Sequence, residues 1–280
     1  MLPPMNSNLS ERDKILIQGV GLTFPSETGL VRVLDGIDLA IKEGEFVTVI
    51  GPSGCGKSTL MNLVSKTVEH TAEHFEGKID IAWRSDAGHR LGYVLQKDTL
   101  LPWRNLEANV GVGLEIMGIA PGERKVQVQS WIDRVGLAGF EKSYPFAMSG
   151  GMRQRANIIR TLACNPEVVL MDEPFGALDA QTRMALQQLL IDLWHAAKTT
   201  ILFVTHDVEE SILLGNRVIL MSRRPAKIHR IFDIDIPHPR SVIDARVAPA
   251  FQEAYREIWK ELKGDIELSQ LKSSAAKGLA

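Results

Sequence analysis

The sequence predicts an α/β fold with a helical block inserted between the two halves of its core. Three observations lead to this prediction. A glycine-rich loop joins a buried strand to a helix, several later apolar strands each end in a polar side chain, and residues 100–147 have the spacing of helices. Continuous apolar runs of this kind are typical of strands buried on both faces of a parallel sheet.

The composition is that of an ordinary soluble globular protein. Apolar residues make up 45% and charged residues 24% of the 280 residues, which suffices for one large domain or two small ones. The formal net charge of -2 argues against nucleic acid as the main partner. Cys55 and Cys164 make neither a disulfide framework nor a zinc site.

The ends and the hydropathy of the chain bear on its location. We expect residues 1–13 to form a disordered lead, and they lack the apolar core of a signal peptide. No apolar run approaches the ~20 residues that are needed to span a bilayer. We therefore expect a cytosolic chain whose membrane role, if it has one, depends on a partner.

The glycine-rich loop predicts a phosphate-binding site. It follows the apolar run Phe46–Ile50 and opens a helix that we expect over 59–64. Its glycines let backbone N–H groups converge on phosphate oxygens, and the helix N-terminus adds a positive dipole end. The lysine can reach the β- and γ-phosphates and the serine can ligate Mg²⁺. The residues of the loop are Gly51, Pro52, Ser53, Gly54, Cys55, Gly56, Lys57, Ser58 and Thr59.

Upstream of this loop, residues 15–41 carry short β-type runs with turn signals at Gly29 and Asp35-Gly36. Phe24 follows one of these runs, where it either stacks on an adenine or serves as a packing residue. Residues 67–90 are expected to hold turns and short strands. Their histidines lack neighbouring cysteines, so a solvated surface is favoured over a metal site; they are His70, His74 and His89.

The apolar run Leu91–Leu95 predicts a strand that ends at Gln96. A polar residue at the carboxyl end of a parallel strand faces the ligand crevice, so Gln96 either contacts Mg²⁺ or the attacking water, or simply ends the strand. Helices are then expected over 106–116 and 124–135, the second with one buried face.

Ser149 precedes two glycines, Gly150 and Gly151, at the start of another expected helix. A serine N-cap followed by glycines makes a second helix N-terminus that can receive an anion. Taken alone, the same pattern also fits an ordinary Ser-Gly cap.

The apolar strand Val168–Met171 ends in the adjacent carboxylates Asp172 and Glu173. Two carboxylates at the tip of a buried strand are costly unless they serve a cation or a proton transfer. Asp172 suits the coordination of Mg²⁺ and Glu173 suits a general base for water. Asp179 follows shortly, before a helix over 180–197.

A further strand over 200–205 delivers His206 to the same edge, where it can contact a γ-phosphate. A last core strand is expected over 217–221, and then loop and short strand over 225–239. An amphipathic helix follows, either docked on the core or offered to a partner; its apolar residues are Phe251, Tyr255, Ile258, Trp259 and Leu262.

Taken in order, these motifs resemble those of an ATP-binding-cassette (ABC) ATPase. The resemblance covers residues 14–225, with a helical subdomain at about 100–155, and leaves 226–280 as a tail. It implies a P-loop core of the RecA type with an N-terminal antiparallel β subdomain. The family's elements would then be its A-loop aromatic Phe24, Walker A at 51–59, the Q-loop Gln96, the signature at 149–152, Walker B at 168–173, the D-loop at 177–179 and the switch histidine His206.

The resemblance also implies a mechanism and partners. ABC ATPases work as head-to-tail dimers, so Ser149 and Gly151 would bind the γ-phosphate of ATP held by the other chain's Lys57, with Mg²⁺ held by Ser58, Gln96 and Asp172. A membrane permease would hold the dimer at the cytoplasmic face of the inner membrane, and a periplasmic solute-binding protein would act indirectly. Leu101–Asn105, Met152 and the segments 222–228 and 236–240 look like the nitrate, sulfonate and taurine import group.

Three other functions are compatible with parts of the sequence. An ABC exporter subunit would share every nucleotide motif of this chain. The sequence also does not identify the transported solute, because selectivity lies in partner proteins. ATPases of DNA repair carry long heptad insertions or zinc-binding cysteines, and neither pattern is present. A P-loop kinase is disfavoured by the Ser149-Gly150-Gly151 segment.

Overall fold

The computed structural model describes residues 13–27, 29–68, 74–84, 91–97, 99–176 and 178–277. The chain divides into two compact units. Unit 1 takes the segments before Glu43, Phe46–Ile81 and the chain from Val204 onward, whereas unit 2 consists of Glu43–Glu45 and Ala82–Phe203. Each unit is described by itself. His70, His89 and most of the lead at 1–13 lie outside the described residues.

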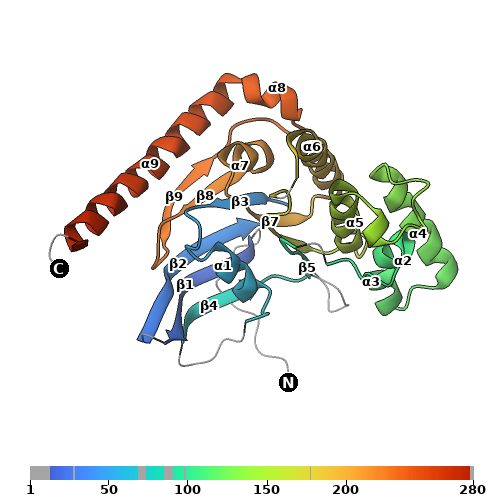
Figure 1. Cartoon of the computed structure of the whole chain (residues 1–280), viewed down its shortest axis with the longest axis horizontal. Helices are drawn as coiled ribbons and strands as arrows, with labels where there is room; N and C mark the ends of the chain where they lie inside the picture. Colours follow the sequence, from blue (N-terminus) through green and yellow to red (C-terminus); the bar gives the residue numbers. More distant parts are fainter. Residues whose placement is uncertain are drawn as a thin grey trace. The chain divides into compact units, whose positions relative to one another are not determined.

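Unit 1 contains an antiparallel sheet in the order β2-β1-β4 (Figure 1), formed by β1 (Asp13–Ser26), β2 (Gly29–Lys42) and β4 (Phe75–Ile81). The turn predicted at Gly29 is confirmed. The turn predicted at Asp35-Gly36 is wrong, because both residues lie within β2. The register between β1 and β2 shifts here, and Gly36 has a φ of 64°. A bulge with glycine in the left-handed region therefore replaces the turn.

Three further strands of unit 1, which belong to a second sheet, are β3 (Phe46–Ile50), β8 (Arg217–Met221) and β9 (Ile228–Asp233). Strands β3 and β8 run parallel, and β9 pairs with β8 in the antiparallel direction. All five residues of β3 are buried, as the continuous apolar run predicts. The parallel pairing brings the loops that follow β3 and β8 to the same edge of the sheet.

The C-terminal helix docks on unit 1. Helix α9 (Pro249–Lys277) follows α8 (Val242–Val247) and packs against α7 (Val208–Leu214). Its residues Phe251 and Ile258 are buried. On the side toward β9, Arg230 donates to Glu257 and Glu261, and His229 lies 3.1 Å from Glu261. Of the two alternatives for this helix, the docked one is therefore confirmed.

Unit 2 contains β5 (Leu91–Val94), β6 (Val168–Asp172) and β7 (Thr200–Val204), which lie in that order. The first two strands are parallel. Helix α6 (Ala180–Ala197) buries Leu186, Leu190 and Trp194, whereas its last residue, Ala197, is exposed.

The helical block of unit 2 lies between β5 and β6 in sequence. It consists of α2 (Leu106–Val110), α3 (Val112–Ile116), α4 (Pro121–Arg134), the 3₁₀ turn η1 (Pro145–Ala147) and α5 (Gly150–Leu162). The single helix predicted over 106–116 is interrupted at Gly111, where a Cβ would lie 3.2 Å from Val128 Cγ2 of α4. The predicted start of α4 moves to Pro121, which occupies the first turn as prolines do.

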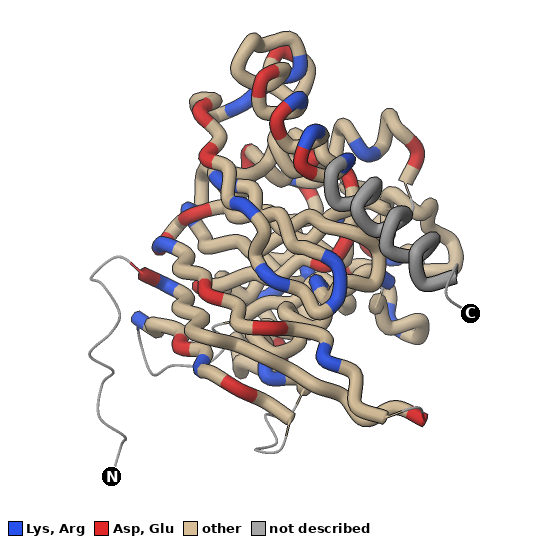
Figure 2. The backbone as a smooth tube through the Cα atoms, turned by 90° about the vertical axis from the view of Figure 1, so that its left-hand side faces the viewer, with Lys and Arg blue, Asp and Glu red and all other residues tan. Residues whose placement is uncertain are grey.

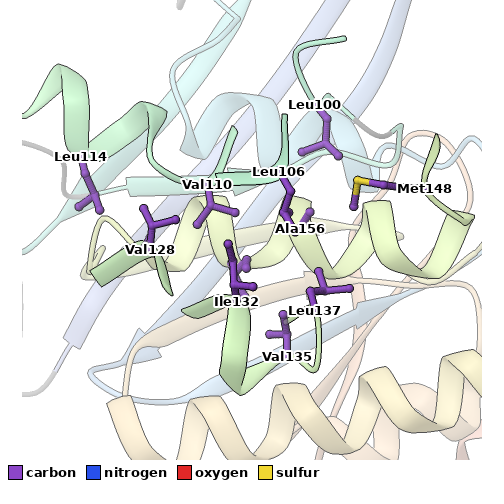
Figure 3. Packing of buried hydrophobic residues seen from close by; sticks show 12 residues of the cluster. Leu100, Leu106, Val110, Leu114, Val128, Ile132, Val135, Leu137, Met148 and Ala156 are labelled. Carbon is purple, nitrogen blue, oxygen red and sulfur yellow. The ribbon is translucent and has the colours of Figure 1, made fainter. Parts of the chain in front are cut away.

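The helical block has its own apolar core, in which side chains from α2, α4 and α5 converge (Figure 3). Its centre includes the fully buried Val110, Ile132 and Ala156. Each of these helices contributes one apolar face, as amphipathic helices of a bundle do. Within the described part of the chain, no helix combines the length and the apolar character of a membrane-spanning segment.

A buried arginine ties the C-terminal segment to α7. Arg240 is 2% exposed, and its guanidinium donates to the carbonyls of Ile212, Leu213 and Gly215 at the end of α7 and to that of Ile236. These are carbonyls that a helix end leaves without partners. Burial lowers the pKa of Arg240 to about 10, so the side chain remains cationic at neutral pH.

Replacing Arg240 with methionine keeps much of the volume and removes every donor. We expect Arg240→Met to lower the free energy of unfolding by about 3 kcal/mol or more, because several buried carbonyls lose a charged donor at once. Urea unfolding followed by circular dichroism measures the change. The exposed Arg256→Met is the matched control, with an effect below about 0.5 kcal/mol. Equal midpoints for the two variants would contradict this account.

Candidate functional site

The loop between β3 and α1 (Lys57–Val64) has the geometry of an anion cradle. Gly56 precedes the helix with a φ of 129°, and α1 has no side-chain cap on its first N–H groups. A Cβ at Gly51 would lie 2.7 Å from the carbonyl oxygen of Met221 in β8. Only glycine fits at these two positions, and the uncapped N–H groups remain available to an anion.

Lys57 lies buried in the middle of this cradle. Its ammonium donates to the carbonyls of Gly51 and Pro52 at 2.9 and 3.1 Å. An ammonium group has three protons, so one donor remains for an incoming phosphate oxygen. Cys55 is buried beside it, and burial raises the pKa of its thiol. The cysteine therefore fills space beneath the loop as a neutral group.

His206 and the start of the loop line one cavity of about 660 Å³ in unit 1. Arg223, which follows β8, contributes a cation to the same walls. The next residue, Arg224, donates to the carbonyl of Gly54. His206 is exposed and precedes Asp207, which caps α7 by accepting from the Glu210 N–H at 3.2 Å. His206 and the start of the phosphate loop thus line the same cavity within unit 1, and contact of His206 with a γ-phosphate stays a prediction.

In unit 2, the end of β6 carries the two adjacent carboxylates. Asp172 is buried as the last residue of the strand, and Glu173 has a φ of 44°. A glutamate in the left-handed region is uncommon and is found where surrounding structure holds it there. Gln96 Nε2 donates to Glu173 Oε2 at 3.3 Å, so the residues that end β5 and β6 meet.

The donor set around Asp172 fits a hard divalent cation such as Mg²⁺. Asp172 has a buried carboxylate, and Gln96, whose amide nitrogen donates to the adjacent Glu173, has a carbonyl oxygen; both are oxygen ligands of the kind this ion prefers. Tyr93 on β5 is kept neutral, because burial and then the charge of Asp172 raise the pKa of its phenol. Among the described residues, no group of three or more His, Cys, Asp or Glu side chains forms an all-protein metal site.

The second predicted helix start is confirmed as a capped N-terminus. Ser149 Oγ accepts from the Met152 N–H at 3.3 Å at the start of α5. Gly150 opens onto free space, whereas a Cβ at Gly151 would lie 2.5 Å from Thr182 Cγ2 of α6. Gly150 therefore leaves room for a ligand, and Gly151 allows the two helices to approach.

Asp179 has a structural role within unit 2. It caps α6 by accepting from the Thr182 N–H at 2.9 Å, and this bond lowers the pKa of its carboxyl group. Ala177, the first residue of the predicted D-loop, lies outside the described residues.

Phe24 lies near the end of β1 in unit 1 with 37% of its surface exposed, as a ring available for stacking would be.

The sequence reading missed one polar residue that shapes the surface of the helical block. Asn109 is fully buried, and its side chain bonds the backbone of Leu101, Arg104 and Asn105. It fixes the loop that presents Trp103, which is 71% exposed. An asparagine inside an apolar helical stripe was the available signal, because a buried amide needs partners.

The candidate residues thus fall into two groups. Unit 1 holds the phosphate loop and His206 around one cavity, and unit 2 holds the carboxylates, Gln96 and the capped start of α5. Acidic and basic positions are interspersed along the tube of Figure 2. Such interspersion agrees with a site for a small ligand rather than a nucleic-acid surface.

The ABC transporter family matches residues 34–176. An aliphatic sulfonates import ATP-binding protein, SsuB of Bacillus cereus, is 41% identical over 251 residues, covering 89% of this chain and 96% of that protein. An uncharacterised ABC transporter ATP-binding protein of Methanocaldococcus jannaschii, MJ0412, is 42% identical and covers 90% and 92% of the two chains.

A solved structure gives a further comparison. The ATP-binding cassette MJ0796, in a dimeric post-hydrolysis state bound to ADP and Pi, has a TM-score of 0.69 and 28% identity. The match covers 80% of this chain and all of that one.

Gly51→Ala tests the phosphate loop directly. The added methyl group would collide with the Met221 carbonyl and displace the loop, so we expect at least a tenfold loss of affinity for a fluorescent ATP analogue, roughly 1.4 kcal/mol. Gly122→Ala is the control, because a Cβ there meets open space. Unchanged affinity in Gly51→Ala would show that this loop does not hold the nucleotide.

Proposed function

We propose that this chain drives the import of a sulfonate or a related small anion. The premise is that the chain belongs to the ABC transporter family and is an ATP-binding ATPase of that fold. The observation that carries this proposal is the match to the SsuB protein of Bacillus cereus over 96% of that protein's length. The solute itself would be selected by a binding protein and a permease. The ATPase would supply the work at the cytoplasmic face of the membrane.

The two anion-receptive helix starts support a dimer. One chain carries an uncapped start at α1, in unit 1, and a serine-capped start at α5, in unit 2. A head-to-tail pair would place Ser149 of one copy against the γ-phosphate held by Lys57 of the other. The dimeric MJ0796 cassette, which binds ADP and Pi, supports this arrangement.

The chemistry follows from the residues around the phosphates. Lys57 would bind the β- and γ-phosphate oxygens and stabilise the charge that develops on them. Glu173 would accept a proton from the attacking water as that water forms its bond to γ-phosphorus, and ADP would leave. His206 would contact a γ-phosphate oxygen. Hydrolysis would then separate the two copies and reset the transporter.

Magnesium ion would neutralise part of the phosphate charge when it is bound with ATP. Ser58, Asp172 and Gln96 are the residues of this chain that would hold it. Asp172 is buried at the tip of β6, and a carboxylate is a ligand that this ion prefers.

The loop of residues 101–105 is the surface that we propose for the permease. Asn109 holds this loop through four hydrogen bonds, and Trp103 protrudes from it. A rigid loop with an exposed tryptophan has the character of an interface anchor. A short cytoplasmic helix of the permease would dock there and move with the helical block.

Glu173→Gln should separate ATP binding from hydrolysis. The amide cannot accept the proton of the attacking water, so we expect hydrolysis to fall by ~10²–10⁴-fold while ATP binding persists. With ATP present, size-exclusion chromatography should show a stable dimer. A variant that stays monomeric with ATP, or that hydrolyses at the wild-type rate, would contradict the proposed base and dimer.

Trp103→Ala should uncouple transport from hydrolysis. Because this side chain lies on the exposed loop of the helical block, ATP hydrolysis by the isolated chain should change less than twofold. In vesicles that contain the permease and the solute-binding protein of the same import system, we expect at least a tenfold loss of sulfonate uptake. This corresponds to roughly 1.4 kcal/mol of lost docking free energy. Phe140→Ala, which removes another exposed ring of the same unit, is the control. Equal uptake in both variants, or solute efflux in place of uptake, would refute this part of the proposal.

A further inference from the structure

We infer that helix α9 forms part of the surface on which a second copy of this chain docks, with Phe146 of that copy packing against Tyr255 and Trp259. The inference rests on the proposed function, which brings two copies together around ATP. It assigns a contact to the C-terminal helix that the nucleotide motifs do not require.

The first observation is the composition of the cavity beside the phosphate loop. Its lining includes Gly51–Ser53 of the phosphate loop, Arg223, and His206 with the residues that follow it, Asp207, Val208 and Glu209. It also includes three residues of α9, namely Tyr255, Trp259 and Leu262. The loop and Arg223 suit phosphate groups, whereas the aromatic side chains of α9 suit an apolar occupant.

The second observation is that the aromatic side chains of α9 are fixed in place. Tyr255 and Trp259 meet edge to face, with 6.1 Å between their ring centroids. The helix that carries them is held by the buried Ile258 and by the ion pairs of Arg230 with Glu257 and Glu261. A helix anchored on both sides is a wall of the cavity and not a lid that swings aside. Trp259 nevertheless keeps 36% of its surface exposed.

The third observation concerns the segment that the second copy would bring to this place. Phe146 precedes Ser149 by three residues and is 82% exposed, and its ring stacks on Tyr144 at 5.7 Å. Three residues span at most about 11 Å of chain. If Ser149 reaches the phosphate beside Gly51–Ser53, then Phe146 is brought to the cavity that Gly51–Ser53 share with Tyr255 and Trp259.

These observations are complementary. One surface offers a fixed aromatic wall in which Trp259 is 36% exposed, and the other offers an exposed ring three residues before Ser149. Aromatic pairs are worth more than their buried area alone. In a twofold dimer the contact occurs twice, so its effect on association is doubled.

A double-mutant cycle in the isolated full-length chain tests the contact without a permease. Trp259→Ala and Phe146→Ala are made singly and together in the Glu173→Gln background, and the dimer dissociation constant is measured with ATP by analytical ultracentrifugation. We expect each single change to weaken the dimer about tenfold, and the pair to add no more than about threefold, because both remove the same contact. Trp259→Phe, which keeps a ring, should retain most of the affinity.

Ile243→Ala is the matched control, since it removes an exposed apolar side chain of α8 outside the cavity. The affinity of each variant monomer for ATP is measured as well. It should be unchanged, which would show that the phosphate loop is intact. The inference would be overturned if neither single variant changed the dimer dissociation constant, if the two effects multiplied in the double variant, or if Trp259→Ala tightened the dimer. Each of these outcomes would leave the proposed function standing. If the Glu173→Gln chain itself does not dimerise with ATP, both the inference and the proposed dimer fail.

Discussion

The two hydrogen bonds from Lys57 to the carbonyls of Gly51 and Pro52 are the interaction on which the rest of the site depends. They close the loop after β3 around a buried ammonium, whose charge the backbone carbonyls stabilise. The loop can close in this way because Gly51 approaches the Met221 carbonyl of β8 more closely than any side chain allows. The anion site thus depends on the parallel pairing of β3 and β8.

Strand ends place the remaining chemistry. In unit 1, the edge that follows β3 and β8 carries the loop and the two arginines, and His206 stands before α7 on the shared cavity. In unit 2, Gln96 and Glu173 meet at the ends of the parallel strands β5 and β6. The C-terminal segment also supports this edge, because Arg240 binds the end of α7, the helix that begins beside His206.

Much of the fold followed from patterns in the sequence. The continuous apolar runs gave the core strands, and Ser149 and Asp179 were recognisable as helix caps because their side chains satisfy free N–H groups. The errors have physical causes. Asp35-Gly36 has the composition of a turn, yet long-range pairing with β1 absorbs it as a bulge. Gly111 ends a helix because α4 packs against it, and such a contact has no signature in the local sequence.

The site was predictable where it depends on local chemistry and not where it depends on distant packing. The phosphate loop carries its function in nine consecutive residues. By contrast, the anchoring of the 101–105 loop by Asn109, and the place of Tyr255 and Trp259 beside Gly51–Ser53, arise only when separate segments fold together. The same holds for the left-handed backbone of Glu173, which no residue type in that position would announce.

The central claim is that each ATP lies between Lys57 of one copy and Ser149 of the other. The most direct measurement mixes a Lys57→Ala chain with a Ser149→Arg chain, each inactive alone, and follows ATP hydrolysis. A mixed dimer would contain one site with both residues intact, so the account predicts that activity returns on mixing. Activity that stays at the level of the separate variants would contradict it.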